Sequence, residues 1–398
     1  MAIYSFGFSN CFSFEESTDV SFVLDKRTGA NETFFVSSLT EERLSKVLAV
    51  VGANGSGKTN LIKPLSYILW FITDSFFGGV EASRHFVRPH MFSESPVLEF
   101  KLDFEADGVR YRYLMLRSAE KVYFESLSKK TSRLWSKVFT RKWDTDLGAY
   151  EITRKGFGSA QMPLREVDPN VSLISLAAQY KSKAAVSICA ALRRRSSNVN
   201  SFGREIIDGG DIFEVSSFYH SNETEREAMV KFLREQDFGV EDIDIEAYDR
   251  TQDDGTVSKH YLPWVIHKRG DAEFRLPLIY ESSGTQAAYY LMSKIIPLLA
   301  QGGIMICDEL EGDLHPLMIE PILDLFINPR TNPLNAQIIF TTHSIEVLNF
   351  LQKNQVMLVE KSDSASEAWK LSEMDGVRSD DNFYAKYMSG AYGAIPRV

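Results

Sequence analysis

Cysteine is scarce in this chain of 398 residues, which contains only Cys11, Cys189 and Cys307. The three lie far apart, and no two of them have the spacing of metal ligands. Disulfide frameworks are typical of secreted proteins, whereas the thiols of cytoplasmic proteins stay reduced. The sequence therefore predicts buried, reduced thiols in a cytoplasmic protein.

Long apolar runs are absent as well. The sequence has no stretch of roughly eighteen apolar residues, the length that a membrane-spanning helix needs. Its beginning, MAIYSFGFSN, lacks the basic and then apolar pattern of a secretory signal peptide. We therefore expect no membrane among the partners of this protein.

An excess of basic residues is also lacking. Lysine and arginine number 44 against 54 aspartates and glutamates, which gives a formal net charge of −10. A protein that coats nucleic acid must neutralise phosphates, so this balance argues against one. Nucleic-acid binding is left open but is not indicated. A basic cluster, LRRRSSN at 192–198, is interpreted as a solvated helix end rather than as a contact with nucleic acid or a partner.

The remaining composition, 44% hydrophobic and 25% charged, is that of a globular protein with one large domain or two. Alternating residues over 97–129 and 132–155 predict antiparallel hairpins. The patterns divide the chain into an N-terminal part with an antiparallel β lobe (1–155), a helical insertion (156–240) and a C-terminal part (241–398).

Strands buried on both faces occur near both ends of the chain. VLAVV at 47–51 is a continuous apolar run of this kind. Similar strands, GIMICDE (303–309), QIIFTTH (337–343) and QVMLVEK (355–361), alternate with helical patterns in the last third. Such alternation is typical of a mainly parallel sheet. We therefore predict an α/β fold whose first and last parts share one sheet.

GANGSGKT at 52–59 fits the phosphate-loop pattern G-x-x-x-x-G-K-[ST] in full, with a strand before it and a helix after it. The glycines let backbone N–H groups point at phosphate oxygens, and the helix N-terminus adds positive potential. Lys58 would reach the β- and γ-phosphates of ATP, and Thr59 would bind Mg²⁺. The predicted nucleotide-binding residues of this segment are Gly52, Asn54, Gly55, Ser56, Gly57, Lys58, Thr59 and Asn60.

Two further strands end in polar residues. GIMICDE carries Asp308 and Glu309 to the carboxyl edge of the sheet, where ligands of open α/β folds bind. Asp308 would hold the water shell of Mg²⁺, and Glu309 would polarise the attacking water as general base. His343 ends a third strand at the same edge, where a donor to the γ-phosphate belongs. Taken alone, the Asp-Glu pair also fits a solvated strand end and the histidine a hydrogen-bonded bystander, but the phosphate loop favours catalytic roles.

These motifs in this order, GANGSGKT, ESSGTQ, ICDELEGDLHP and FTTHS, resemble the ABC/SMC-like ATPases. More narrowly, they look like the AAA-type ATP-binding proteins of bacterial anti-phage and abortive-infection operons. Relatives of that group are the ATPase part of OLD-family nucleases and the ATPase of Septu-type systems. The tail YMSGAYGAIPRV (387–398) is similar to the closing motif of the narrower group. The resemblance is weak in the middle of the chain.

The resemblance implies a role for the stretch ESSGT. ABC-like ATPases carry a signature motif, usually LSGGQ, which reaches across a head-to-tail dimer to the γ-phosphate of the other subunit. Ser282 and Gly284 match this motif, whereas Glu281, Ser283 and Thr285 depart from it. Hydroxyls, free N–H groups and a helix N-terminus make an anion site, so Ser282, Ser283 and Gly284 are assigned to a shared nucleotide site. An ordinary serine N-cap is the alternative.

Other positions also follow from the resemblance. Gly312 to His315 looks like the D-loop, which senses the opposite site. Glu311 lies close enough to Glu309 to compete for the role of base, and Glu309 is preferred. A glutamine that normally contacts magnesium and water is not evident, and Arg88 or His90 is suggested in its place.

Nuclease motifs are not convincing in this chain. RHFVRPH at 84–90 has the loose Arg-to-His spacing of some helical ribonucleases, but Pro89 would interrupt the helix. EMDGVRSDD at 373–381 lacks the separate acidic strands of a TOPRIM nuclease domain. The chain is therefore expected to carry no nuclease of its own.

Together the motifs predict an ATP-hydrolysing, ABC/SMC-like head with ATP and Mg²⁺ as cofactors. A homodimer or higher homo-oligomer is the expected assembly. By analogy with the family, hydrolysis controls a separately encoded effector, a nuclease or toxin, in anti-phage defence. The alternatives are a RecF-like DNA-binding repair or recombination ATPase and a nucleotide-dependent scaffold with negligible turnover.

Overall fold

The computed structural model describes residues 1–24, 32–78, 85–130, 132–164, 166–205, 209–251 and 257–396. At its centre lies a six-stranded sheet in the order β11-β17-β18-β5-β19-β20, parallel except between β19 and β20. Because β5 pairs with both β18 and β19, the prediction that the two ends of the chain share one sheet is confirmed. The strands are β5 (Val47–Val51), β11 (Arg195–Ser197), β17 (Ile304–Cys307), β18 (Gln337–Thr341), β19 (Val356–Ser362) and β20 (Ala365–Lys370).

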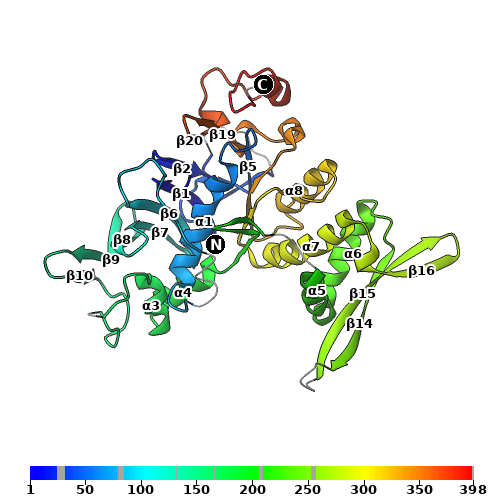
Figure 1. Cartoon of the computed structure of the whole chain (residues 1–398), viewed down its shortest axis with the longest axis horizontal. Helices are drawn as coiled ribbons and strands as arrows, with labels where there is room; N and C mark the ends of the chain where they lie inside the picture. The colour runs from blue at the N-terminus through cyan, green and yellow to red at the C-terminus, as the bar shows by residue number, and fades with distance from the viewer. Residues whose placement is uncertain are drawn as a thin grey trace.

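Alternate residues of β5 belong to two different hydrophobic cores. Leu48 and Val50 join the core that contains helix α1 (Lys58–Asp74). Val47, Ala49 and Val51 join the core of α7 (Ser283–Gln301) and α8 (Ile319–Ile327). Side chains alternate across a strand, so an unbroken apolar run such as VLAVV suits a strand that is covered on both faces. Figure 1 shows α1 on one side of β5, and α7 and α8 on the other.

A second sheet, seven-stranded and antiparallel, has the order β10-β9-β8-β7-β6-β1-β2 and packs against α1. Asp107 and Gly108 both have positive φ, 48° and 68°, as a two-residue hairpin turn between β6 and β7 requires. Both predicted hairpins are confirmed. The strands are β1 (Ala2–Ser9), β2 (Thr18–Ser21), β6 (Leu98–Ala106), β7 (Val109–Arg117), β8 (Val122–Lys130), β9 (Trp135–Asp144) and β10 (Ala149–Arg154), and a separate hairpin comprises β3 (Phe34–Val36) and β4 (Arg43–Ser45).

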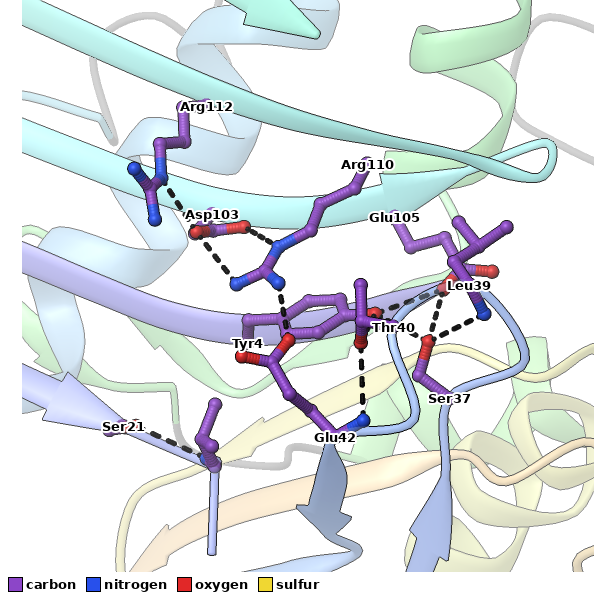
Figure 2. A network of polar contacts seen from close by, with 11 residues as sticks. Tyr4, Ser21, Ser37, Leu39, Thr40, Glu42, Asp103, Glu105, Arg110 and Arg112 are labelled. Atoms are coloured by element: carbon purple, nitrogen blue, oxygen red, sulfur yellow. Dashed lines mark hydrogen bonds and ion pairs between the residues drawn. The ribbon is translucent and has the colours of Figure 1, made fainter. Parts of the chain in front are cut away.

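Arg110 of β7 ties the β3–β4 hairpin to the antiparallel sheet (Figure 2). Its guanidinium binds both carboxylate oxygens of Asp103, at 2.7 and 3.0 Å, and also pairs with Glu42, the residue before β4. It stacks over the ring of Tyr4, with 3.8 Å between the guanidinium carbon and the ring centroid. A buried cation with two carboxylate partners is electrostatically satisfied, so this contact can anchor the hairpin.

The segment 156–240 contributes to several parts of the fold. Helices α3 and α4 join the core around α1, whereas α5 and α6 pack against α7. Between them β11 enters the central sheet beside β17, a strand that the sequence analysis did not predict because it is too short to show a periodicity. The three-part division of the chain therefore stays a proposal. The elements are α3 (Leu173–Gln179), α4 (Lys183–Leu192), β12 (Val199–Asn200), β13 (Gly203–Arg204), α5 (Gly209–Ser221) and α6 (Glu223–Glu235).

A three-stranded sheet of β14 (Asp242–Thr251), β15 (Val257–Arg269) and β16 (Ala272–Pro277) precedes α7. Figure 1 shows it projecting from the body beyond α5 and α6. His267 of β15 lies 2.6 Å, Nε2 to Oε1, from Glu281 at the start of the predicted signature. This contact joins the projecting sheet to the segment that begins α7.

The last part of the chain completes the core around α7 and α8. No helix within the described ranges is long and apolar enough to cross a membrane. The remaining elements are the 3₁₀ helices η1 (Leu278–Tyr280), η2 (Pro316–Met318), η3 (Ile345–Asn349), η4 (Lys353–Gln355) and η5 (Leu371–Glu373), and helix α9 (Phe383–Met388).

Candidate functional site

The phosphate loop connects β5 to α1, and two of its glycines are required by their surroundings. Gly57 has a φ of 111°, and a Cβ there would lie 2.4 Å from Oγ of Ser366. A Cβ at Gly52 would lie 2.2 Å from the carbonyl oxygen of Val359. A side chain at either position would clash with β19 or β20 and displace the loop, so the loop's shape depends on glycine.

Lys58, the first residue of α1, folds back over the phosphate loop. Its Nζ donates to the carbonyl oxygens of Gly52 at 3.0 Å and Ala53 at 3.1 Å. Burial lowers the pKa of the Lys58 ammonium, and nearby carboxylates, Asp308 foremost, act in the opposite direction. A buried ammonium gains from a strong anionic partner, which the phosphates of a nucleotide would supply.

Thr59 and Asp308 meet where a cation would bind. Oγ1 of Thr59 lies 2.9 Å from each carboxylate oxygen of Asp308, and Thr341 donates to Asp308 at 2.7 Å. A hydroxyl and a carboxylate are hard oxygen donors of the kind that Mg²⁺ prefers. Over the described ranges no group of three or more His, Cys, Asp or Glu side chains could hold a metal. The residues therefore fit a Mg²⁺ ion that keeps water ligands and takes phosphate oxygens.

Mg²⁺ alone should therefore bind this protein with a dissociation constant on the order of millimolar or weaker, because only two side chains could hold it. Calorimetry with Mg²⁺, with and without nucleotide, measures this. Asp308→Asn should remove the gain in ATP affinity that Mg²⁺ produces, whereas Asp324→Asn on α8 should keep it. Micromolar Mg²⁺ binding in the absence of nucleotide would contradict the assignment.

Glu309 and His343 face each other at the same edge of the sheet. Oε1 of Glu309 lies 3.4 Å from Nε2 of His343, whose Nδ1 lies 3.4 Å from Nζ of Lys58. Glu309 has a φ of 51°, and its N–H donates to Oγ1 of Thr341 at 2.8 Å. Positive φ is uncommon for residues other than glycine and marks a backbone that its surroundings hold in place. Three predicted catalytic residues, Lys58, Glu309 and His343, are thus brought together.

Glu311, the competing base, has a different environment. Its Oε1 accepts the backbone N–H of His343 at 2.6 Å, and its Oε2 is buried without a hydrogen-bond partner. Glu309 is 39% exposed and directs its carboxylate towards the His343 imidazole. A water molecule at the sheet edge could reach Glu309 more readily, which supports the original preference.

Asn198, the residue after β11, was missed by the sequence analysis. Its side-chain amide donates to the carbonyl oxygen of Asp308 at 3.0 Å and accepts the N–H of Asp308 at 2.7 Å. Its amide lies beside the predicted metal ligand and bonds to the backbone of Asp308, whereas the sequence analysis suggests Arg88 or His90 in place of the missing glutamine. His90 is instead buried, with Nε2 3.3 Å from the carbonyl oxygen of Ser364. Only the pairing of β11 with β17 reveals Asn198.

The predicted signature begins α7, and its first serine is an N-cap. Oγ of Ser282 accepts the N–H of Thr285 at 3.1 Å, yet Ser282 and Ser283 are both exposed. A Cβ at Gly284 would lie 3.3 Å from the carbonyl oxygen of Asp313 in the predicted D-loop. No side-chain hydrogen bond in the described part of the chain joins this stretch to the phosphate loop. This arrangement is therefore compatible with the predicted contact between Ser282 or Ser283 and the nucleotide site of a second chain.

The other predicted loop residues differ in their surroundings. Asn54 and Gly55 are exposed at the tip of the loop, and Gly55 has a φ of 73°. Oγ of Ser56 is buried without a hydrogen-bond partner. Nδ2 of Asn60 donates to Oγ of Ser13 at 3.0 Å, so a structural role accounts for this side chain.

The C-terminal tail braces the phosphate loop. The carbonyl oxygen of Ala394 accepts the N–H of Ala53 at 3.1 Å and the hydroxyl of Tyr387 at 2.7 Å. The N–H of Ala394 donates to Glu360 of β19 at 3.0 Å. A cavity of about 810 Å³ lies between the loop, His343 and the tail. The closing motif thus helps to fix the loop backbone.

The basic cluster LRRRSSN lies at the end of α4, where Arg193 and Arg194 are exposed, in agreement with the predicted solvated helix end. Arg193 and Arg195 both form ion pairs with Asp74 at the end of α1, each at 2.8 Å. Arg193 also donates to the carbonyl oxygen of Thr73. Cations near the last carbonyls of a helix are stabilising. All three arginines also bond within the fold, since Arg194 donates to the carbonyl oxygen of Gln301 at 3.4 Å.

The chain is similar to a known protein family and to solved structures. A family profile described as "AAA domain, putative AbiEii toxin, Type IV TA system" matches residues 47–349. No curated protein matches the chain. Among solved structures, the chain is similar to "Crystal structure of the SmcHead bound to the C-winged helix domain of ScpA", with 13% identity, 93% of this chain and 97% of that chain covered, and a TM-score of 0.46. It is also similar to "SMC head domain from Thermotoga maritima", with 13% identity, coverage of 93% and 99%, and a TM-score of 0.45.

Proposed function

Because the chain belongs to the family described as AAA domain, putative AbiEii toxin, Type IV TA system, we propose that it hydrolyses ATP within a dimer and thereby controls a separately encoded effector. The family match and the P-loop fold support an AAA-type ATPase. The observation that carries the proposal is the convergence of Lys58, Asp308, Glu309 and His343 at one edge of the central sheet.

The chemistry assigns one task to each of these groups. Lys58 binds the β- and γ-phosphates, and backbone N–H groups of the loop orient them. Glu309 accepts a proton from the water that attacks the γ-phosphorus, and the proton passes to the phosphate released with ADP. His343 donates a hydrogen bond to the γ-phosphate oxygens, where negative charge accumulates. Thr59 and Asp308 would hold Mg²⁺, which would supply positive charge to neutralise the phosphates.

A second copy of the chain would complete each site. Ser282 and Ser283 are exposed at the start of α7, where hydroxyls and N–H groups can face an anion. In the proposed dimer they meet the γ-phosphate bound by the other chain, and Gly312 to His315 lies at the same boundary. ATP would then draw two heads together, and its hydrolysis would release them.

The effector is proposed on the family description and on the sequence. That description refers to a putative toxin and to toxin–antitoxin systems. The sequence suggests no nuclease motif within the chain, so we assign the toxic activity to a separate protein, a nuclease or toxin acting in anti-phage defence. Closing and opening of the heads would hold or release it.

Ser283→Glu tests the dimer, because a carboxylate there would face the γ-phosphate of the other chain. In a Glu309→Gln background with ATP and Mg²⁺, light scattering should show a doubled mass for the parent chain, which keeps Ser283. The Ser283→Glu variant should keep the mass of a monomer. ATP affinity of the monomer should stay within about twofold, a difference below roughly 0.5 kcal/mol. Ser38→Glu, at an exposed serine of the β3–β4 loop, is the matched control. An ATP-dependent doubling that survives Ser283→Glu would exclude the signature assignment.

The same variants can serve as baits for the effector. A chain tagged in its own host should retain a partner protein whose yield changes with ATP for the parent and for Ser38→Glu, but not for Ser283→Glu. A partner that is retained equally by all three baits, with or without ATP, would contradict nucleotide control.

A further inference from the structure

Arg204 lies beside the candidate base and was not among the predicted site residues. It is the last residue of β13, and its Nη1 lies 3.2 Å from Oε2 of Glu309. We propose that Arg204 is a positioning residue for Glu309, which orients the carboxylate for hydrolysis and links it to the D-loop. The inference rests on the proposed function, because that function makes Glu309 the base.

The carboxylate of Glu309 is held at both oxygens by groups from different parts of the chain. Oε1 lies 3.4 Å from Nε2 of His343, and Oε2 pairs with Arg204. The backbone of Glu309 is fixed by Thr341, but three side-chain torsions separate it from the carboxylate. Without a partner for Oε2 the side chain would populate several rotamers. The guanidinium supplies an orientation that the backbone alone cannot impose.

Arg204 comes from a hairpin that is anchored to the rest of the fold. Val199 pairs with Arg204 across β12 and β13, and its carbonyl oxygen accepts the hydroxyl of Ser66 on α1 at 3.0 Å. Ser201 in the turn donates to the carbonyl oxygen of Phe86 at 2.6 Å. The guanidinium therefore acts from a fixed position next to the phosphate-loop helix, as a positioning group must.

The D-loop leaves room for this guanidinium. A Cβ at Gly312 would lie 2.1 Å from Nη1 of Arg204 and 3.1 Å from the carbonyl oxygen of Glu309. Alanine at this position would push the flexible end of Arg204 away from Glu309. Gly312 begins the segment that the proposed dimer places at the subunit boundary. Arg204 thus contacts both the base and the segment that a second chain would meet.

A neighbouring cation provides a control for the charge of Arg204. Arg204 and Glu309 line a cavity of about 590 Å³ together with Tyr290 and Lys294 of α7. Nζ of Lys294 lies 4.9 Å from the ring centroid of Tyr290. Removing Lys294 changes the charge of the same cavity without removing the partner of Glu309.

The test is a steady-state ATPase assay of Arg204→Met, Arg204→Lys and Lys294→Met, each also measured as single turnover in the Glu309→Gln background. Arg204→Met should lower kcat about 10- to 100-fold, the effect of a misplaced catalytic group, with the KM for ATP within about twofold. Arg204→Lys should recover part of kcat, and Lys294→Met should match the wild type. In the Glu309→Gln background Arg204→Met should have no further effect, because its role acts through that carboxylate.

Gly312→Ala gives a second route that leaves Arg204 in the chain. Gly312→Ala should lower kcat as Arg204→Met does, and the double variant should be no slower than Arg204→Met alone. Melting temperatures show whether both variants are folded. A wild-type rate equal to that of Glu309→Gln would overturn the proposed function and this inference with it. If the wild-type rate is well above that of Glu309→Gln, two outcomes would overturn the role of Arg204 alone. One is an Arg204→Met variant as active as the wild type, and the other is an Arg204→Met substitution that lowers the rate equally with and without Glu309→Gln.

Discussion

Replacement of Lys58 by alanine is expected to weaken ATP binding by a factor of roughly 100 or more. The Lys58 ammonium would form charge-assisted hydrogen bonds to two phosphates, each worth about 1.5–3 kcal/mol. Its removal also leaves the carbonyl oxygen of Gly52 without the Lys58 ammonium and that of Ala53 with the N–H of Ser56 alone, so the empty loop loses part of its shape. Calorimetry or fluorescence titration with an ATP analogue measures the change.

Lys183→Ala is the matched control for this substitution. Lys183 is also the first residue of a helix, α4, but it is exposed and lies outside the phosphate loop. Its loss should leave ATP affinity unchanged. If Lys58→Ala binds ATP as tightly as Lys183→Ala does, the loop at 52–59 does not hold the phosphates.

Replacement of Glu309 by glutamine should lower kcat about 10²- to 10⁴-fold while ATP affinity is retained. Glutamine keeps the size of the side chain but cannot accept a proton from water at neutral pH, which removes the contribution of general-base catalysis. ATP should then hold the closed dimer, so the dimer fraction in the presence of ATP should rise. Phosphate release and light scattering measure the two effects on the same sample.

Glu311→Gln separates the two candidate bases. Glu311 accepts the backbone N–H of His343, so glutamine can keep that bond through its amide oxygen, and a smaller loss of rate is expected. A larger loss for Glu311→Gln than for Glu309→Gln would move the base to Glu311. Equal, near-zero rates in the wild type and in Glu309→Gln would favour the nucleotide-dependent scaffold.

Several site residues could be predicted because local pattern alone is sufficient for them. The phosphate loop needs glycines and Lys58 at set spacings between a strand and a helix, and all of these are neighbours in the chain. Asp308 and His343 end apolar runs, and parallel strands bring their carboxyl ends to one edge. Their proximity therefore follows from the sheet type, without knowledge of any side-chain contact.

Asn198 and Arg204 could not be found in this way. Asn198 follows a strand of three residues, too short for a periodic signal, and bonds to Asp308, which lies 110 positions later. Arg204 stands in a two-residue strand, and its relation to Glu309 depends on how the hairpin is anchored on α1. The ion pairs of the basic cluster could not be predicted for the same reason, since Asp74 lies far from it in sequence.

Spacing along the chain thus determined that this protein has a phosphate loop, a parallel α/β core and the polar strand ends that accompany them. Such features depend on backbone geometry and side-chain periodicity, which act over a few residues. The orientation of the Glu309 carboxylate depended on folding in space, because Arg204 reaches it from the β12–β13 hairpin, and Thr341 and His343 reach it from the end of β18. Long-range packing selects those neighbours, and no short stretch of sequence contains them.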